Sequence, residues 1–209
     1  MRIIDCGVIG FHEAFALQEL LAAGIAAGRE DETLLLLEHP PVYTIGSGGD
    51  HANILDSTLT VERINRGGDV TWHGPGQLVG YPLVNLGTRG RDLHRWLRFL
   101  ESLLIETLAS FGISGRCRHD SRGVWTGRGK IAFIGVGVRR WITMHGFGLN
   151  VHPDLRAYKR INPCGVAGCP VTSMALELEQ TPSEAAVRMA LKKSFERHLN
   201  ERLPREAAR

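Results

Sequence analysis

Short segments rich in valine, isoleucine and glycine alternate with long helical stretches, and this alternation constrains the fold more than any other feature of the sequence. The segments are LVGYPLVNL (78–86), GVWTG (123–127), KIAFIGVGV (130–138) and ITMHGFGLNV (142–151). Runs of this length that are bounded by glycine are typical of β-strands. A further strand, LLLLEHPPVYTIG (34–46), is predicted to break at Pro40 and Pro41. We therefore expect an α+β (α/β mixed) protein, with a mixed central sheet flanked by helices.

The helical stretches are recognised by the spacing of their apolar residues. The clearest runs from Asp92 to Phe111, where leucine, tryptophan and phenylalanine form one stripe behind an Asp92 N-cap. An alanine- and leucine-rich helix is predicted over residues 13–28. Near the end, Thr181-Pro182-Ser183-Glu184 predicts an N-cap, a first-turn proline and a capping-box glutamate for a helix that runs to about Leu199.

Length and composition indicate a single domain over residues 1–209. The chain is long enough for a substantial core, and 43% hydrophobic with 22% charged residues is ordinary for a globular protein. No apolar run approaches the roughly 20 residues of a membrane span, and the first residues lack a secretion-signal pattern, so we expect a cytoplasmic protein without a membrane partner. The net charge of +3 excludes little. At about residues 204–209 the composition is no longer typical of a packed segment, and we expect a frayed tail there.

Two of the four cysteines lie five positions apart in INPCGVAGCPVTS (161–173). Cys164 and Cys169 could form a metal pair, a disulfide or a redox couple, or one could be a nucleophile beside an inert neighbour. A disulfide framework is not expected without an export signal. Zinc sites use closer pairs such as Cys-x2-Cys together with further ligands nearby, so no metal site is predicted.

The sequence contains no recognisable nucleotide-binding motif. A P-loop needs Gly-Lys-Ser/Thr, which is absent, and GVGVRR from Gly135 and GSGGDH from Gly46 both lack the third glycine of the dinucleotide fingerprint. Aromatic residues make up 7% of the chain and do not interleave with lysine or arginine, so nucleic-acid binding is not expected either.

Polar side chains lie beside glycine-rich backbone at three places. RGGDVTWHGPGQLVGYPLV (66–84) crowds glycines around His73, HGFGLN surrounds His145, and Lys130 opens an apolar strand. Glycine lets backbone N–H groups approach a ligand closely. Taken singly, a histidine in a structural turn and a lysine that extends into solvent are the simpler interpretations. The recurrence of the pattern favours a binding site.

A reactive cysteine needs a nearby cation, because only about 3% of an ordinary thiol is ionised at pH 7. A neighbouring ammonium that lowered the thiol pKa by about two units would raise this fraction to roughly three-quarters. Lys130 and Cys164 are therefore a candidate activator and nucleophile for covalent acyl transfer.

Three blocks, residues 66–84, 129–151 and 161–174, together resemble the lipoyl(octanoyl) transferases of the lipoate-protein ligase B type. From first to last they span about half of the chain, in the order found in that family. The resemblance implies the fold of the biotin and lipoate ligase catalytic domains. It also implies that an octanoyl group passes from the thioester of octanoyl-acyl carrier protein to an enzyme cysteine, and then to a lysine of a lipoyl domain. The implied acceptors are lipoyl domains of 2-oxoacid dehydrogenase E2 subunits and the glycine cleavage H protein, with no cofactor.

The resemblance also implies site residues. The cysteine of the NPCG motif is Cys164, the acyl-thioester nucleophile, which leaves Cys169 as the inert neighbour. The lysine of the K-I-A-x-x-G strand is Lys130, which would lower the cysteine pKa and act as acid and base. His145 is a supporting candidate because of its place among glycines, not because of the resemblance. The implied substrate-binding residues are Arg66, Gly67, Gly68, Asp69, Val70, Thr71, Trp72, His73, Phe133, Ile134, Gly135, Gly146, Phe147 and Gly148.

Two departures from the family pattern concern the acyl chain. Phe133 stands where a small alanine or serine is usual, and Gly148 replaces the more usual alanine, so the chain-length preference stays open. An ATP-dependent lipoate or biotin-protein ligase and an octanoyl amidotransferase are alternatives on the same fold. We expect a monomer.

Overall fold

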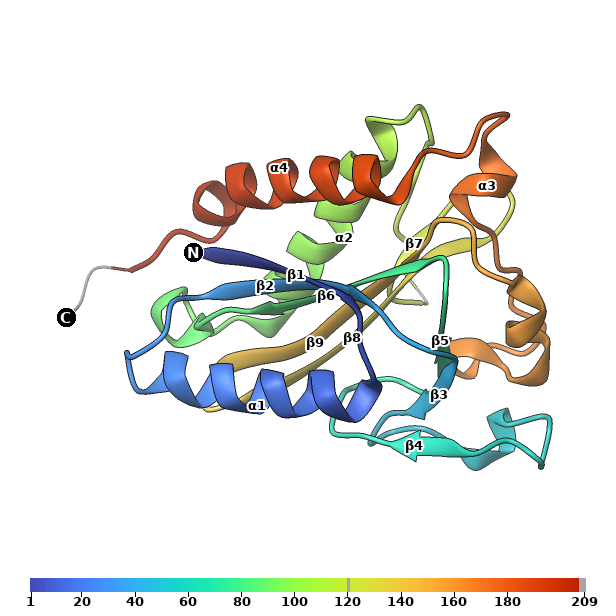
Figure 1. Cartoon of the computed structure of the whole chain (residues 1–209), viewed down its shortest axis with the longest axis horizontal. Coiled ribbons are helices and arrows are strands. Elements are labelled where there is room, and N and C mark those ends of the chain that lie inside the picture. Colours follow the sequence, from blue (N-terminus) through green and yellow to red (C-terminus); the bar gives the residue numbers. More distant parts are fainter. Residues whose placement is uncertain (120, 207–209) are drawn as a thin grey trace.

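The computed structural model describes residues 1–119 and 121–206, and its central feature is a six-stranded mixed sheet (Figure 1). The strands lie in the order β1 (Arg2–Val8), β2 (Thr33–Glu38), β6 (Gln77–Leu83), β9 (Ile142–Asn150), β8 (Lys130–Arg139) and β7 (Val124–Trp125). β1 and β2 are parallel, and the other neighbouring pairs are antiparallel. The predicted fold class is confirmed, and the four glycine-punctuated segments are β6, β7, β8 and β9.

Helices cover both faces of this sheet. α1 (Phe11–Ala26) packs against β6 and β9 on one face, whereas α2 (Leu93–Ala109) and α4 (Glu184–Arg202) pack together on the opposite face (Figure 1). In β2, Leu34 and Leu36 join the core beneath α2 and α4, while Leu35 and Leu37 join the core beneath α1. Because successive side chains of a strand point to opposite faces, burial on both sides explains the continuous leucine run.

A second, three-stranded sheet lies at one end of the first, with β3 (Val42–Ile45) between β4 (Val61–Arg63) and β5 (Thr71–His73) (Figure 1). The predicted break at Pro40 and Pro41 is confirmed, because the chain leaves β2 there and enters β3 in the other sheet. The sequence did not predict this sheet, and it placed Trp72 and His73 in a glycine-rich loop. Short helical turns complete the fold: η1 (His51–Asn53), η2 (Leu86–Thr88), η3 (Leu155–Arg160), η4 (Pro163–Gly165) and α3 (Met174–Glu177).

One of the two predicted helix caps is correct. The Asp92 side chain accepts from the N–H of Arg95 at 2.8 Å and caps α2 as expected. The prediction that Thr181 caps α4 is wrong, because the N-cap is Ser183, whose hydroxyl accepts from the N–H of Ala186 at 3.3 Å. Glu184 then occupies the first helical position and pairs with His152 at 3.0 Å, so its carboxylate does not complete a capping box.

The end of the chain returns to the body of the protein. The Arg205 guanidinium lies 2.9 Å from a carboxylate oxygen of Glu32, and the Glu206 N–H donates to the Thr88 carbonyl at 2.8 Å. The rest of the expected frayed tail, residues 207–209, lies outside the described residues. In the described part of the chain no helix combines the length and apolar character needed to cross a membrane.

Candidate active site

The turn that carries Cys164 holds it in an unusual backbone conformation. Cys164 has φ 56° and ψ 26°, and Gly165 follows with φ 74°. A left-handed conformation costs a non-glycine residue about 1–2 kcal/mol, so surrounding contacts must hold the turn. The Cys164 N–H donates to the carbonyl of Val70 at 2.9 Å, which ties the turn to the residue that precedes β5.

A second set of hydrogen bonds clamps the same turn from η1. Asn53 Nδ2 donates to Asp69 Oδ2 at 2.8 Å, and the Asn53 carbonyl accepts from the N–H of Asn162 at 2.7 Å. A methyl group on Gly165 would approach Asp69 Oδ2 to 3.1 Å, so the turn and this carboxylate are in close contact. The sequence analysis did not identify Asn53, because no spacing or motif connects it to the cysteine.

Lys130 is fully buried and its amine lies against the Cys164 thiol. Nζ donates to Cys164 Sγ at 3.2 Å and to Ser121 Oγ at 3.2 Å. It also lies 4.9 Å from the ring centroid of Phe133 and 5.5 Å from that of Trp125, distances at which aromatic faces attract cations. The lysine therefore does not extend into solvent, and the contact expected between residues 130 and 164 is present.

Arg66 organises the backbone next to the cysteine. Its buried guanidinium donates to the carbonyls of Gly67, Thr44 and Asp69 at 3.0, 3.0 and 2.9 Å. Burial lowers the pKa of Arg66, while negative charge at Cys164 acts in the opposite direction. Because a guanidinium stays protonated in proteins, Arg66 contributes a fixed positive charge near the sulfur.

A narrow cavity with about 30 Å³ of open space leads from Cys164 toward α1. Besides Cys164, ten of the predicted site residues line this cavity: Arg66, Thr71, His73, Phe133, Ile134, Gly135, His145, Gly146, Phe147 and Gly148. Phe11, Ile64 and Tyr81, which were not predicted, complete the lining. A volume of this size holds about one or two water molecules. The side chains must therefore move if the cavity is to admit a longer ligand.

The remaining predicted site residues lie elsewhere. Gly67 and Gly68 line a different cavity, described below. Asp69 belongs to the clamp, Val70 is fully buried in the core, and Trp72 packs edge-on against Tyr158 with ring centroids 5.6 Å apart. Asp69 and Val70 support the cysteine turn, and none of the three residues lines the narrow cavity.

The two buried histidines of the cavity are neutral at pH 7. Burial lowers the pKa of His73 to about 3 and that of His145 to about 4, because a charged imidazolium is poorly solvated there. His73 Nδ1 donates to Gln77 Oε1 at 2.6 Å, and His145 Nε2 donates to Asn65 Oδ1 at 3.0 Å. These tautomers follow from the amide partners. Neither histidine therefore adds a positive charge to those of Lys130 and Arg66 near Cys164.

Gln77 accepts a hydrogen bond from His73, which lines the cavity, and it explains one departure from the family pattern. Its Nε2 donates to Tyr158 Oη at 2.7 Å and to Asn150 Oδ1 at 3.0 Å. A Cβ at Gly148 would lie 2.6 Å from Gln77 Oε1, so an alanine there would displace this amide. The other departure, Phe133, stacks on Tyr158 with ring centroids 5.0 Å apart.

A second cavity, of about 300 Å³, also reaches Cys164. It shares Ile134 and Gly135 with the narrow cavity, but it is otherwise lined by Gly67, Gly68, Leu93, Leu97, Ser121, Arg122 and Val136. The narrow cavity includes Phe11 of α1, whereas this one includes Leu93 and Leu97 of α2. The two helices cover opposite faces of the sheet, so the two cavities leave Cys164 in different directions.

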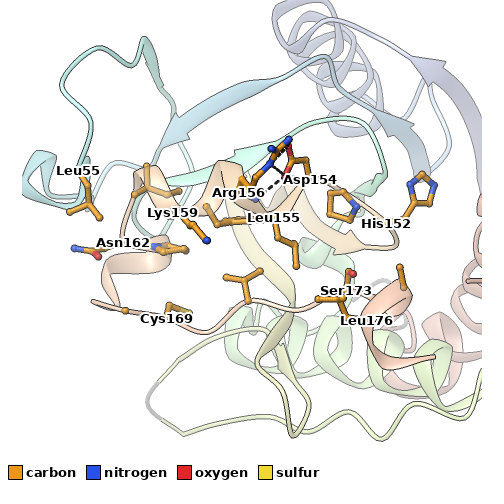
Figure 2. A pocket seen from close by; sticks show the side chains of 17 residues that line it. Leu55, His152, Asp154, Leu155, Arg156, Lys159, Asn162, Cys169, Ser173 and Leu176 are labelled. Carbon is orange, nitrogen blue, oxygen red and sulfur yellow. Dashed lines mark hydrogen bonds and ion pairs between the residues drawn. The ribbon is translucent and has the colours of Figure 1, made fainter. Parts of the chain in front are cut away.

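Cys169 lies on another cavity, a broad groove of about 720 Å³ (Figure 2). Leu55, Lys159 and Leu176 are among the residues that line it. Burial raises the pKa of the Cys169 thiol, which favours its neutral form. Both cysteines are free thiols, so they do not form a disulfide. Among residues 1–119 and 121–206, no group of three His, Cys, Asp or Glu side chains could hold a metal ion.

Solved structures place this architecture among the lipoate and biotin ligases. Lipoate-protein ligase A bound with ATP superimposes with a TM-score of 0.71 at 17% identity, over 99% of this chain and 87% of that chain. Biotin protein ligase from Aquifex aeolicus, in complex with biotin and ATP, gives a TM-score of 0.58 at 14% identity, over 98% and 73%. At such low identity these similarities show the fold alone. It is the biotin and lipoate ligase catalytic-domain fold that the sequence predicted.

Sequence comparison defines the family. The family model described as "Lipoyl protein ligase A/B catalytic domain" matches residues 11–196, and the chain belongs to this family. A protein named octanoyltransferase from Geotalea uraniireducens is 58% identical over 204 residues, which cover 98% of this chain and 95% of that protein. The predicted family and enzyme class, an acyltransferase, are confirmed.

Proposed function

We propose that this acyltransferase moves an octanoyl group from the thioester of acyl carrier protein to a lysine of a lipoyl domain, with Cys164 as the transient carrier. The proposed acceptors are the lipoyl domains of 2-oxoacid dehydrogenase E2 subunits and the glycine cleavage H protein. The observation that carries this proposal is the 3.2 Å contact between the buried Lys130 Nζ and Cys164 Sγ. A buried ammonium stabilises a thiolate, and a thiolate is the nucleophile that thioester exchange requires.

In the first half-reaction, the Cys164 thiolate attacks the thioester carbonyl and a tetrahedral oxyanion forms. Collapse of this intermediate breaks the carbonyl bond to the carrier sulfur. The departing carrier thiolate takes a proton from the Lys130 ammonium, so the products are an acylated Cys164, a carrier thiol and a neutral Lys130 amine. Ser121 Oγ, 3.2 Å from Nζ, keeps the amine oriented when the thiolate is consumed.

In the second half-reaction, an acceptor lysine that has lost a proton to solvent attacks the Cys164 thioester as a free amine. Lys130, now neutral, takes a proton from the attacking nitrogen. The amide forms and Cys164 leaves as a thiolate, which restores the original ammonium and thiolate pair. One lysine thus serves as the acid in the first half and the base in the second.

The narrow cavity is the proposed site of the octanoyl chain, since most of the predicted substrate-binding residues line it. Burial of the chain at about 0.8 kcal/mol per methylene would contribute roughly 5 kcal/mol. With about 30 Å³ open, the cavity must widen by movement of side chains such as Phe133. Binding and widening are therefore expected to occur together.

Intact-mass spectrometry tests the proposal against the ATP-dependent alternative. Incubation with octanoyl-acyl carrier protein, without ATP, should leave the enzyme heavier by one octanoyl group, and a lipoyl domain added later should remove it. An absolute requirement for ATP would refute the proposal, and so would an acylated lipoyl domain that serves as the sole donor.

A further inference from the structure

We propose that the 300 Å³ cavity between α2, β8 and the Gly67-Gly68 turn is the channel through which the donor's thioester arm reaches Cys164. This inference rests on the proposed function and concerns the route of the donor. Cys164 lies where this cavity and the narrow cavity meet, with Ile134 and Gly135 bordering both. The cavity is referred to below as the α2 channel.

The geometry of a thioester requires two routes at the nucleophile. Its carbonyl carbon bears an acyl chain on one side and a sulfur-linked arm on the other, and both are present when Sγ attacks. The narrow cavity runs toward Phe11 of α1, and the α2 channel runs toward Leu93 and Leu97 of α2. Because these helices lie on opposite faces of the sheet, a carbonyl at Sγ can place its two substituents in the two cavities.

The walls of the α2 channel suit a flexible, largely uncharged arm. Leu93, Leu97 and Val136 offer apolar contacts for methylene groups, and the bare backbone of Gly67 and Gly68 lies within reach of amides. Leu93 is 38% exposed, so it lies toward the protein surface, whereas Cys164 lies at the inner end. An arm built of short alkyl segments and amides matches this alternation of apolar wall and open peptide groups.

The mouth of the channel favours an acidic partner protein. The Arg122 side chain lines the channel and is 52% exposed, and its Nη1 lies 3.9 Å from a carboxylate oxygen of the buried Glu101. A further exposed arginine, Arg98, lies in the N-terminal part of α2, the part that also carries Leu93 and Leu97. Such positive charge steers acidic partners toward the opening, and the attraction weakens with salt.

Two tryptophan substitutions that narrow the channel test the proposal. Leu97→Trp narrows it midway, and Leu93→Trp narrows it near the surface, where a larger side chain disturbs the fold less. Leu176→Trp is the control, since Leu176 is a comparably exposed leucine on the broad groove near Cys169 (Figure 2). For each protein we would measure the rate of Cys164 acylation by hexanoyl-, octanoyl- and decanoyl-carrier protein, and the rate of alkylation by iodoacetamide.

Both channel variants should acylate at least about tenfold more slowly with all three carrier proteins, because the arm is common to all three donors. Alkylation uses a reagent much smaller than the thioester arm, so it should slow less than acylation does. The preference of both variants among chain lengths should match that of wild type, as should every rate of Leu176→Trp. Loss of the longer chains with hexanoyl transfer retained would mean that the channel holds the acyl chain, and would overturn the proposal. Unchanged acylation in both variants would overturn it as well.

The outcome for wild type separates this proposal from the proposed function. If wild-type enzyme gains no acyl group from any carrier protein, the proposed function fails before the route of the arm is in question. Arg122→Gln adds a second readout, because it should lower the acylation rate at low ionic strength and flatten its dependence on salt. Equal salt dependence in Arg122→Gln and wild type would contradict the acidic-partner part of the proposal.

Discussion

The loop of residues 163–171 has two sides, and they differ in the properties that decide thiol chemistry. On one side, Cys164 meets a buried lysine amine at 3.2 Å and borders two cavities, of about 30 and 300 Å³. On the other side, Cys169 lines a groove of about 720 Å³, and burial raises the pKa of its thiol (Figure 2). Open volume thus does not mark the reactive sulfur. The reactive sulfur is identified by a cation held beside it, because the cation favours the ionised form of the thiol.

The largest expected effect is the loss of the acyl adduct when the sulfur of Cys164 is removed. Cys164→Ala should show no octanoyl adduct by intact-mass spectrometry and no transfer to a lipoyl domain. Cys169→Ala is the matched control and should keep wild-type rates within about twofold. If only the second variant lost the adduct, the roles assigned to the two cysteines would be reversed.

Removal of the amine should have the next largest effect. Lys130→Met preserves the length of the side chain and deletes its charge, so the rate of octanoyl transfer should fall by about 10²- to 10⁴-fold, the usual contribution of a positioned acid and base. Alkylation of Cys164 by iodoacetamide at pH 7 should slow as well. Lys159→Met provides the control, because Lys159 is an exposed lysine on the groove near Cys169. Equal alkylation rates in the two variants would contradict the role of Lys130.

A smaller effect should appear in the pH dependence of stability. His73 and His145 have folded pKa values of about 3 and 4, below the ordinary value of about 6.5, so the unfolded chain binds protons that the folded protein does not. The stability that each contributes is present above pH 6.5 and is lost as the pH falls. From pH 7 to pH 5 the free energy of unfolding should decrease by roughly 2 kcal/mol per histidine.

Urea denaturation at the two pH values measures this decrease. His145→Asn should reduce it, since asparagine tolerates the positive φ of 55° at this position and does not titrate. His94→Gln, at an exposed position on α2, should leave the decrease unchanged. The same decrease in His145→Asn and wild type would refute the assignment of His145 as a buried neutral group.

The smallest predicted effect concerns the length of the acyl chain. Phe133→Ala should remove the ring beneath Lys130 and extend the narrow cavity toward Tyr158. Room for two more methylenes corresponds to about 1.6 kcal/mol, so the preference for decanoyl over octanoyl donors should rise by about tenfold. Competition between the two donors measures the ratio. Phe111→Ala, which loses a ring on the opposite face of the sheet, should leave the ratio unchanged.

Periodicity was sufficient to predict much of the large sheet and its helices. The apolar stripe of α2 and the continuous leucines of β2 are long enough to define an element. β5 could not be predicted in this way, because its three residues become a strand only when β3 lies beside them. The cap of α4 was misplaced by two residues for a similar reason, since the contact between Glu184 and His152 decides the role of that carboxylate.

The candidate site was predicted by resemblance more than by pattern. Nothing in the spacing of Lys130 and Cys164, 34 residues apart, requires them to meet. The residues that support them, Asn53, Ser121 and Gln77, were missed. Each is an ordinary polar residue without a motif, and its role depends on hydrogen bonds between distant segments.

The two reacting groups are anchored to different sheets. Lys130 begins β8 of the large sheet. The Cys164 turn is hydrogen-bonded to Val70, the residue that precedes β5 of the small sheet. The distance between Cys164 Sγ and Lys130 Nζ therefore depends on the position of one sheet relative to the other. The loop that carries Cys164 is also bonded to Lys130, because the Lys130 N–H donates to the Pro170 carbonyl at 2.8 Å and the Lys130 carbonyl accepts from the Thr172 N–H at 3.0 Å. A displacement of the small sheet would have to strain this loop before it lengthened the distance between sulfur and nitrogen, so the loop keeps the two reacting groups together.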